Sequence, residues 1–343
     1  MRPLRHFVLL MLLSAPALLH ADTTIRFKMN MKLAEGLPPA AAEQMAKNPQ
    51  TQFPRETVVQ IKGDKGYSNA GRTISVMDLT KQQITLIDTE HKLFATVYAK
   101  DFPGVLGSAM ALPPMPPAAQ AFLKSITPDF SIQKTGKTDA ILGIQAEETE
   151  CTISMQMVIP PGFPPGVGTL KSGDTVTLMK LVLHIWTPLP AEVNRVPALT
   201  EFAAHSWKQI SADPATAMQQ MLPNFPGLSD GLAKMAEQMS KSTAPALRTH
   251  VELYVPILGQ ITALAPGKIQ QVLGAYDPST PFVQTDSEVV EISTAPVDAS
   301  VFEVPGGYTS TTLPDLLKAM RPAPPLRPAN ANLPPVPPPS AAP

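Results

Sequence analysis

Residues 57–98 contain five short segments in which apolar and polar residues alternate, separated by turns of only a few residues. Alternation with a period of two is typical of a strand that buries one face. A parallel neighbour would need a crossover of a dozen residues or more, so such short connections favour antiparallel pairing. The pattern predicts an antiparallel meander with strands at residues 57–62, 66–69, 73–78, 83–88 and 93–98.

Alternating segments also lie before and after this meander. Residues 24–32 have one apolar and one polar face, whereas residues 175–186 are largely apolar on both faces, which is typical of a central strand. Further strands are predicted at residues 131–134, 145–158, 247–255, 260–264 and 287–293.

Residues 197–241 have a different periodicity and are predicted to be a helical insert. Leu228, Leu232, Met235 and Met239 recur at the spacing of one stripe of an amphipathic helix. Two more helices are predicted at residues 199–210 and 214–222. About ten strands with helical interruptions favour one antiparallel α+β domain, over residues 22–312, rather than alternating β and α units.

The N-terminal residues 1–21 have the order of a cleavable secretory signal peptide. Arg2 and Arg5 precede an apolar run, and Ala21 stands before Asp22, the expected first mature residue. The alternative is a retained membrane anchor, but the run is short and contains a proline. We therefore expect an exported protein, periplasmic or extracellular, that is soluble after cleavage and is not an integral membrane protein.

The C-terminal residues 313–343 are predicted to be a proline-rich, disordered tail. Proline fixes φ and removes a hydrogen-bond donor, so this segment favours an extended conformation over a packed element. Just before it, Phe302 and Tyr308 are the aromatic residues beside a turn rich in proline and glycine. We expect both to anchor the end of the last strand on the sheet.

Charge and cysteine content exclude several classes of protein. Removing Arg2 and Arg5 from the 27 basic residues leaves 25 against 28 acidic ones, a net charge of −3, and without a basic stripe nucleic acid is not an expected partner. Cys151 is the only cysteine, so an intramolecular disulfide is impossible. It alternates with polar residues in a strand, which predicts a buried thiol.

Residues 227–231 match G-x-S-x-G, the pattern of the serine hydrolase nucleophile elbow. That elbow needs a strand directly before the serine, and the preceding Pro-Asn-Phe-Pro cannot form one. Ser229 and Asp230 are better read as capping residues of the helix that follows.

None of the four histidines that follow the signal peptide has another histidine or a cysteine at metal-ligand spacing, so no metal site is expected. His184 and His250 lie in predicted strands and are expected to meet across the sheet. The carboxylate pairs Glu147–Glu148 and Glu288–Glu291 are interpreted as ordinary strand surface. We therefore expect no catalytic residue, no metal and no cofactor, and the chain is not expected to be an enzyme.

Several short motifs together resemble a group of exported bacterial domains of unknown function. They are Gly63-Asp64-Lys65, Ser75-Val76-Met77-Asp78, Gln83-Ile84-Thr85-Leu86-Ile87-Asp88, Ile185-Trp186-Thr187-Pro188, Ala246-Leu247-Arg248-Thr249 and the stretch from Phe302 to Tyr308. The strand pair around residues 138–150 also belongs to the resemblance, which spans residues 24–308. Such domains are similar to the lipoprotein-carrier proteins LolA and LppX. The resemblance implies a curved, unclosed antiparallel sheet, a half-barrel, that wraps around helices and encloses an apolar cavity.

The resemblance transfers no catalytic residue, but it implies an apolar or lipid-like ligand. Candidate lining residues are Met155, Met157, Trp186, Met235 and Met239. Methionine is flexible and polarizable, so it suits a surface that repacks around a variable guest, although it also fills ordinary cores. The alternative is a structural or interaction module that binds an envelope protein through the proline-rich tail.

Overall fold

The computed structural model describes residues 22–35, 43, 55–110, 125–159, 171–208, 231, 234, 237, 245–258 and 277–320. The strands in these ranges are β1 (Thr23–Leu33), β2 (Arg55–Lys62), β3 (Lys65–Asn69), β4 (Thr73–Asp78), β5 (Gln83–Asp88), β6 (Leu93–Tyr98), β7 (Ile126–Ile141), β8 (Ile144–Val158), β9 (Thr175–Pro188), β10 (Arg248–Tyr254), β11 (Val283–Ser293) and β12 (Thr309–Ser310). The helices are α2 (Phe102–Met110), α4 (Pro190–Arg195), α5 (Pro197–Lys208) and α10 (Leu313–Ala319), with a 3₁₀ helix, η2, at Ala299–Phe302.

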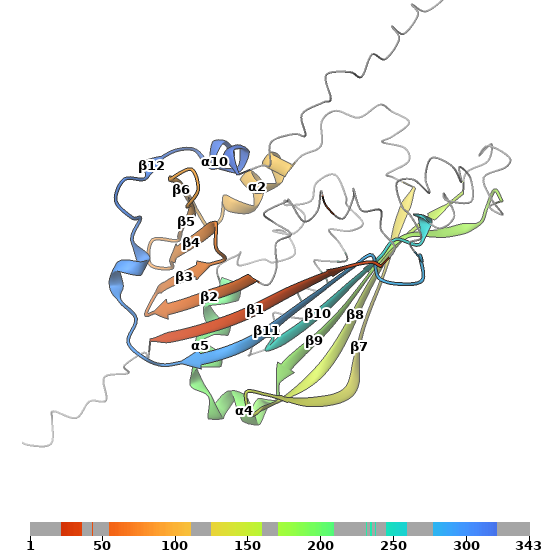
Figure 1. Ribbon diagram of the computed structural model, residues 1–343, viewed down its shortest axis with the longest axis horizontal. Coiled ribbons are helices and arrows are strands. Elements are labelled where there is room, and N and C mark those ends of the chain that lie inside the picture. The colour runs from red at the N-terminus through yellow and green to blue at the C-terminus, as the bar shows by residue number, and fades with distance from the viewer. Residues whose placement is uncertain are drawn as a thin grey trace, which may run out of the picture.

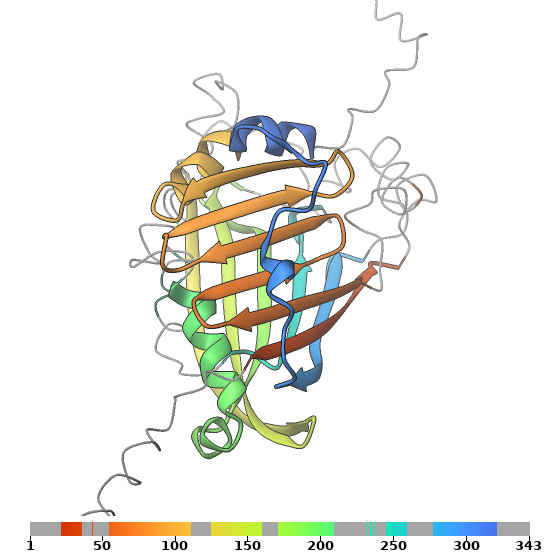
Figure 2. The same cartoon turned by 90° about the vertical axis from the view of Figure 1, so that its left-hand side faces the viewer.

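All twelve strands belong to one sheet, in the order β12-β6-β5-β4-β3-β2-β1-β11-β10-β9-β8-β7. Every neighbouring pair is antiparallel except β12 and β6, which are parallel. The sheet is not closed, and it curves so that β2 to β6 form one wall in front of the wall formed by β7 to β10 (Figures 1 and 2). The chain is therefore α+β, as the sequence pattern predicts, with an open, curved sheet, as the resemblance implies.

The N-terminal meander is the part that the sequence predicts best. Strands β4, β5 and β6 begin and end at the predicted residues. The β2–β3 turn contains Gly63 at φ 58°, a left-handed conformation that glycine adopts without the steric cost paid by other residues. Short turns of this kind pair each strand with the next one along the chain, so β2 to β6 form a continuous meander.

Strand β1 precedes the meander in the chain and lies between β2 and β11, so it joins the two halves of the sheet. It pairs with β2 on one side, where Phe27 lies opposite Thr57, and with β11 on the other, where Phe27 lies opposite Val289. Strand β9 lies between β8 and β10, as expected for a strand that is apolar on both faces. The register makes the odd-numbered residues of β1 face the same side as Leu183 of β9.

The inner face of the curved sheet carries helices at several places. At the β5–β6 end, α2 and α10 pack over a buried cluster that includes Ala95, Leu313 and Leu316 (Figure 2). Near β1, α5 contributes Phe202, whose ring centroid lies 5.8 Å from that of Phe27. The predicted helix at residues 199–210 is thus confirmed, as α5, within the described residues.

The outer face of β2 to β6 is crossed by the chain between β11 and α10. Figure 2 shows this segment, in blue, running over the front of the sheet. We call residues 294–308 the strap. Phe302, which is 7% exposed, packs there with Val76, Ile87 and Val297, and Tyr308 packs against the same cluster. Both aromatic residues therefore pack on the sheet, as predicted, but Phe302 belongs to η2 and not to the end of a strand.

The predicted domain boundary at residue 312 is wrong. Helix α10 follows immediately, capped by Thr312, and its Leu316 is fully buried against β6 and α2. Proline content misled the prediction, because Pro314 lies in the first turn of a helix, where its missing N–H is tolerated. The signal peptide at 1–21, the helix at 214–222, the strand at 260–264 and the tail from 321 lie outside the described residues.

Candidate functional site

The inner face of β8 is a continuous apolar file. Cys151, Ile153, Met155 and Met157 alternate along the strand and are all at most 9% exposed. Burial of the Cys151 thiol, and to a smaller extent the negative charge of Glu150, raises its pKa to about 11. The thiolate is therefore disfavoured, and Cys151 is a packing residue rather than a nucleophile.

The neighbouring strands continue this apolar surface, but their side chains are only half-buried. In the sheet register, Cys151 lies beside Leu183, Leu183 beside Val251, and Val251 beside Thr285. The partly exposed apolar residues of this inner surface are Met29, Met31, Leu181, Leu183, Val251 and Leu253. The centre of the inner face therefore presents aliphatic and thioether groups that the folded chain does not fully cover.

The helical insert approaches this surface at one described point. Gly231 is helical and buried, and a Cβ at its position would lie 3.7 Å from the Cγ2 of Ile153. A helical residue of the insert therefore lies against the β8 file. Ser229, which is predicted to cap a helix, and the predicted lining residues Met235 and Met239 lie outside the described residues.

Met155 and Met157 lie on the inner face, as predicted, but Trp186 does not. Trp186 lies beside Glu148 and Arg248 in the sheet register, on the face opposite to Leu183. The Arg248 guanidinium lies 5.5 Å from the Trp186 ring centroid. Trp186 also packs against the buried cluster that includes Ala146 and Leu247. Its place in a ligand lining stays a prediction, because adjacent strand positions alternate between faces and an apolar side chain alone does not reveal which face is covered.

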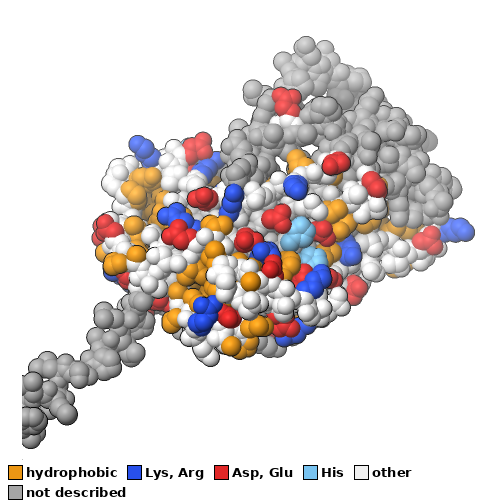
Figure 3. Space-filling view, turned by 60° about the horizontal axis from the view of Figure 1, so that its bottom comes forward, with side chains coloured by type: hydrophobic (Ala, Val, Ile, Leu, Met, Phe, Trp, Pro, Cys, Tyr) orange, Lys and Arg blue, Asp and Glu red, His pale blue; other side chains and the backbone are white. Residues whose placement is uncertain are grey.

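On the outer face, β8 to β11 carry a polar cluster that we call the histidine ladder: Glu148, His184, His250, Glu252 and Asp286. Figure 3 shows histidine side chains, in pale blue, at the surface among acidic and basic side chains. Glu148 is only 1% exposed, so its interpretation as ordinary strand surface was wrong. Its Oε1 lies 2.9 Å from His184 Nδ1, and its Oε2 accepts a hydrogen bond from Thr135 at 2.6 Å.

Glu148 is stabilised as a carboxylate. Burial opposes its ionisation, but the hydrogen bonds from Thr135 and Lys137 and the charges of Lys137 and His184 outweigh burial and lower its pKa. The sequence does not mark Glu148 as buried, because its partners are distant in sequence. They are His184 on β9, and Thr135 and Lys137 in the β7 bulge between Lys134 and Thr138.

His184 and His250 meet across the sheet, as predicted. They are directly paired in the β9–β10 register, with ring centroids 5.8 Å apart. His250 Nδ1 lies 2.7 Å from Asp286 Oδ1, and its Nε2 lies 3.2 Å from Glu252 Oε1. Burial disfavours the charged ring, but the hydrogen bonds to Asp286 and Glu252 and the charges of both residues outweigh it and raise the pKa of His250.

The raised pKa of His250 makes stability depend on pH. The folded state binds this proton more tightly than the unfolded state, so the contribution is complete at pH values below the unfolded value near 6.5 and is lost as the pH rises through the folded pKa. We expect the wild type to lose more stability between pH 6 and pH 8 than His250→Gln does. Urea denaturation at both pH values measures the free energy of unfolding. If the wild type and His250→Gln lost equal stability between pH 6 and pH 8, the assignment would be contradicted.

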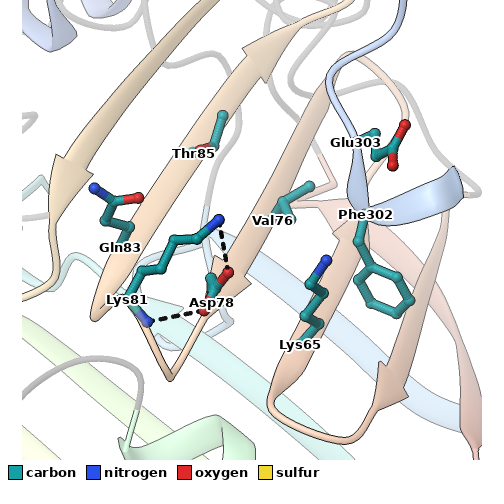
Figure 4. A pocket seen from close by; sticks show the side chains of 8 residues that line it. All are labelled: Lys65, Val76, Asp78, Lys81, Gln83, Thr85, Phe302 and Glu303. Carbon is teal, nitrogen blue, oxygen red and sulfur yellow. Dashed lines mark hydrogen bonds and ion pairs between the residues drawn. The ribbon is translucent and has the colours of Figure 1, made fainter. Parts of the chain in front are cut away.

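A second surface feature lies at the ends of β3, β4 and β5, where a pocket of about 260 Å³ opens beside the strap (Figure 4). Its charged lining residues are Lys65, Lys81, Asp78 and Glu303, so opposite charges balance. Asp78 Oδ1 accepts the backbone N–H of Lys81 at 2.9 Å, and its Oδ2 lies 3.3 Å from Lys81 Nζ. The Asp78 carboxylate therefore stabilises its own turn.

Neither face presents a recognisable reaction centre among the residues that the structure describes. Within them, no three His, Cys, Asp or Glu side chains are grouped to hold a metal ion. No protein-family model matches this chain, and no curated protein matches it. No described helix is both long enough and apolar enough to cross a membrane. The half-covered apolar inner face is consequently the strongest candidate for a binding site.

Proposed function

We propose that this chain is a non-catalytic, exported binding protein that holds an apolar guest, such as an acyl chain, against the inner face of its sheet. The observation that carries the proposal is the partial exposure of apolar side chains at the centre of that face, on β1, β9 and β10. A core that serves only stability buries such residues fully, as Ile153 is buried on the adjacent β8.

The chemistry of the surface suits a flexible hydrocarbon. Each CH₂ that leaves water for an apolar site contributes about 0.8 kcal/mol. Met29 and Met31 on β1 and Met155 on β8 supply adaptable side chains around it. The sheet is open, so a guest need not cross a closed wall to reach this surface. The resemblance to lipoprotein carriers and the signal-like N-terminus support the same reading, outside the cytoplasm.

The alternative role, an envelope interaction module, depends on the proline-rich tail. The tail from residue 321 lies outside the described residues. The two roles differ in what they require of the inner face: only the binding protein needs it to admit a guest.

A paired substitution on β1 tests the binding role. Met31 faces inward and Lys32 faces outward, so Met31→Trp fills part of the proposed site, whereas Lys32→Trp adds the same side chain to the outer face. Displacing about two methylenes of guest costs roughly 1.6 kcal/mol, which weakens binding more than tenfold. We expect that loss in a fluorescent fatty-acid titration for Met31→Trp only.

Native mass spectrometry followed by solvent extraction provides an independent measurement on the purified wild type. We expect a bound lipid-like molecule or, after delipidation, saturable binding of the fluorescent fatty acid. Equal affinities of the two tryptophan variants, or a wild type that neither retains lipid nor binds the probe, would contradict the proposal.

A further inference from the structure

Three polar side chains lie in one row across the inner face of the sheet, on the neighbouring strands β2, β11 and β10 around β1. The register places Arg55 of β2 and Ser287 of β11 directly on either side of Met29 of β1. Thr249 of β10 lies directly beside Ser287. Residues that are paired across a sheet share a face, so all of them lie on the inner face with Met29. We call Arg55, Ser287 and Thr249 the polar row.

Arg55 gives this part of the inner face a positive charge. Among the residues that the structure describes, the inner-face positions of β1, β2, β9, β10 and β11 carry no other Asp, Glu, Lys or Arg. Arg55 also takes part in another interaction within the chain. A guanidinium has several N–H donors in a planar fork, so it can bind a further acceptor beside an existing partner.

The two hydroxyl groups of the polar row can bind the same acceptor. Ser287 and Thr249 are half-buried, and neither hydroxyl has a hydrogen-bond partner among the described residues. A purely apolar guest on this row would leave both hydroxyls without a hydrogen bond, which costs free energy. An oxygen-bearing group placed over Met29 accepts from these hydroxyls and from Arg55.

The polar row separates two different parts of the inner face. On one side α5 covers the sheet, since the ring centroids of Phe27 and Phe202 are 5.8 Å apart. On the other side two further rows are mainly apolar and half-buried, with Met31, Val251 and Leu183 in the first and Leu33, Leu253 and Leu181 in the second. Successive rows on one face are about 7 Å apart, so the apolar part extends about 14 Å from the polar row.

We propose that the guest of the inner face is a single-chain anionic amphiphile, with its head on the polar row and its chain over the two apolar rows, away from α5. This inference rests on the proposed function, because it requires that the inner face admit a guest. The head carries a carboxylate or a phosphate, since both accept paired hydrogen bonds from a guanidinium. Arg55 therefore selects an anionic guest over a neutral one of equal chain length.

Three unlabelled competitors with the same alkyl chain test this assignment on the full chain: dodecanoate, dodecyl phosphate and dodecanol. Each displaces the fluorescent fatty acid from the inner face if it binds there. We expect at least one of the anions to bind about tenfold more tightly than dodecanol, because hydrogen bonds to a charged group are stronger than neutral ones. The anion that binds more tightly identifies the head as a carboxylate or a phosphate.

Substitution of Arg55 tests the origin of that preference. In Arg55→Gln the anions should lose about tenfold in affinity, while dodecanol binds as it does to the wild type and shows that the site is folded. Arg26→Gln is the matched control, because Arg26 faces outward from β1 and pairs with Glu291 at 2.9 Å. It should leave the affinities for all three competitors unchanged.

Equal affinity of the wild type for dodecanol and for both anions would overturn the assignment of the head and leave the proposed function intact. So would an anion preference that is undiminished in Arg55→Gln. If that variant also lost dodecanol, Arg55→Lys decides: a lysine lacks the planar fork, so undiminished anion affinity there would overturn the role of Arg55. A wild type that binds neither the probe nor any competitor would contradict the proposed function itself.

Discussion

Phe302→Ala is expected to destabilise the protein by about 3 to 5 kcal/mol, because it removes an almost fully buried phenyl ring and leaves a cavity. Phe302 is the residue of η2 that packs with Val76, Ile87 and Val297 on the outer face. Without it, the strap loses the largest apolar group at its centre. Urea denaturation followed by circular dichroism measures the change in the free energy of unfolding.

Glu303→Ala is the matched control for this prediction. Glu303 is the next residue in the chain and is exposed, so its truncation should change stability by no more than about 0.5 kcal/mol. If Phe302→Ala were as stable as Glu303→Ala, the strap would not be docked on the sheet in solution.

Two truncations should have very different effects. Deleting residues 321–343 removes a segment poor in apolar surface and should leave the melting temperature unchanged. Deleting residues 313–343 also removes α10, with its buried Leu313 and Leu316. Losing each buried leucine side chain costs about 2 to 5 kcal/mol, so the longer deletion should bring the domain close to unfolding.

Thermal denaturation of both truncated chains beside the full chain tests this contrast. A substantial drop in melting temperature for the shorter deletion would show that the tail packs on the domain. An unchanged melting temperature for the longer deletion would show that α10 contributes no burial. Leu316→Ala isolates the helix from effects of chain length and should itself lose about 2 to 5 kcal/mol.

The sequence predicts the fold best where residues that are close in sequence determine the ends of an element. In β4, β5 and β6 the alternation of apolar residues and the turns between strands define the element ends. Strand β7 is far longer than the predicted 131–134. Its second half is polar and has no alternation of apolar and polar residues, but it is paired with β8. The same local view places the start of a tail at Leu313, whose burial depends on α2 and β6.

The candidate site is predictable in part for the same reason. Alternation along β8 suffices to place Met155 and Met157 on the buried face, and the pairing of His184 with His250 follows from their strands being neighbours. Trp186 and Glu148 are different. The face that helices cover and the partners that stabilise a buried carboxylate are set by residues distant in sequence, which periodicity does not encode.

Strand β1 lies in the middle of the sheet, and this position limits the order in which the strands can pair as the protein folds. The meander and the β8–β9 hairpin use neighbours in sequence, but the ladder that unites the two halves pairs Thr24 with Ser293, near the opposite ends of the folded chain. Closing so long a loop is entropically costly and slow. A growing chain therefore cannot assemble the whole sheet before β11 exists, and the two halves of the sheet stay unjoined until synthesis of the folded domain is almost complete.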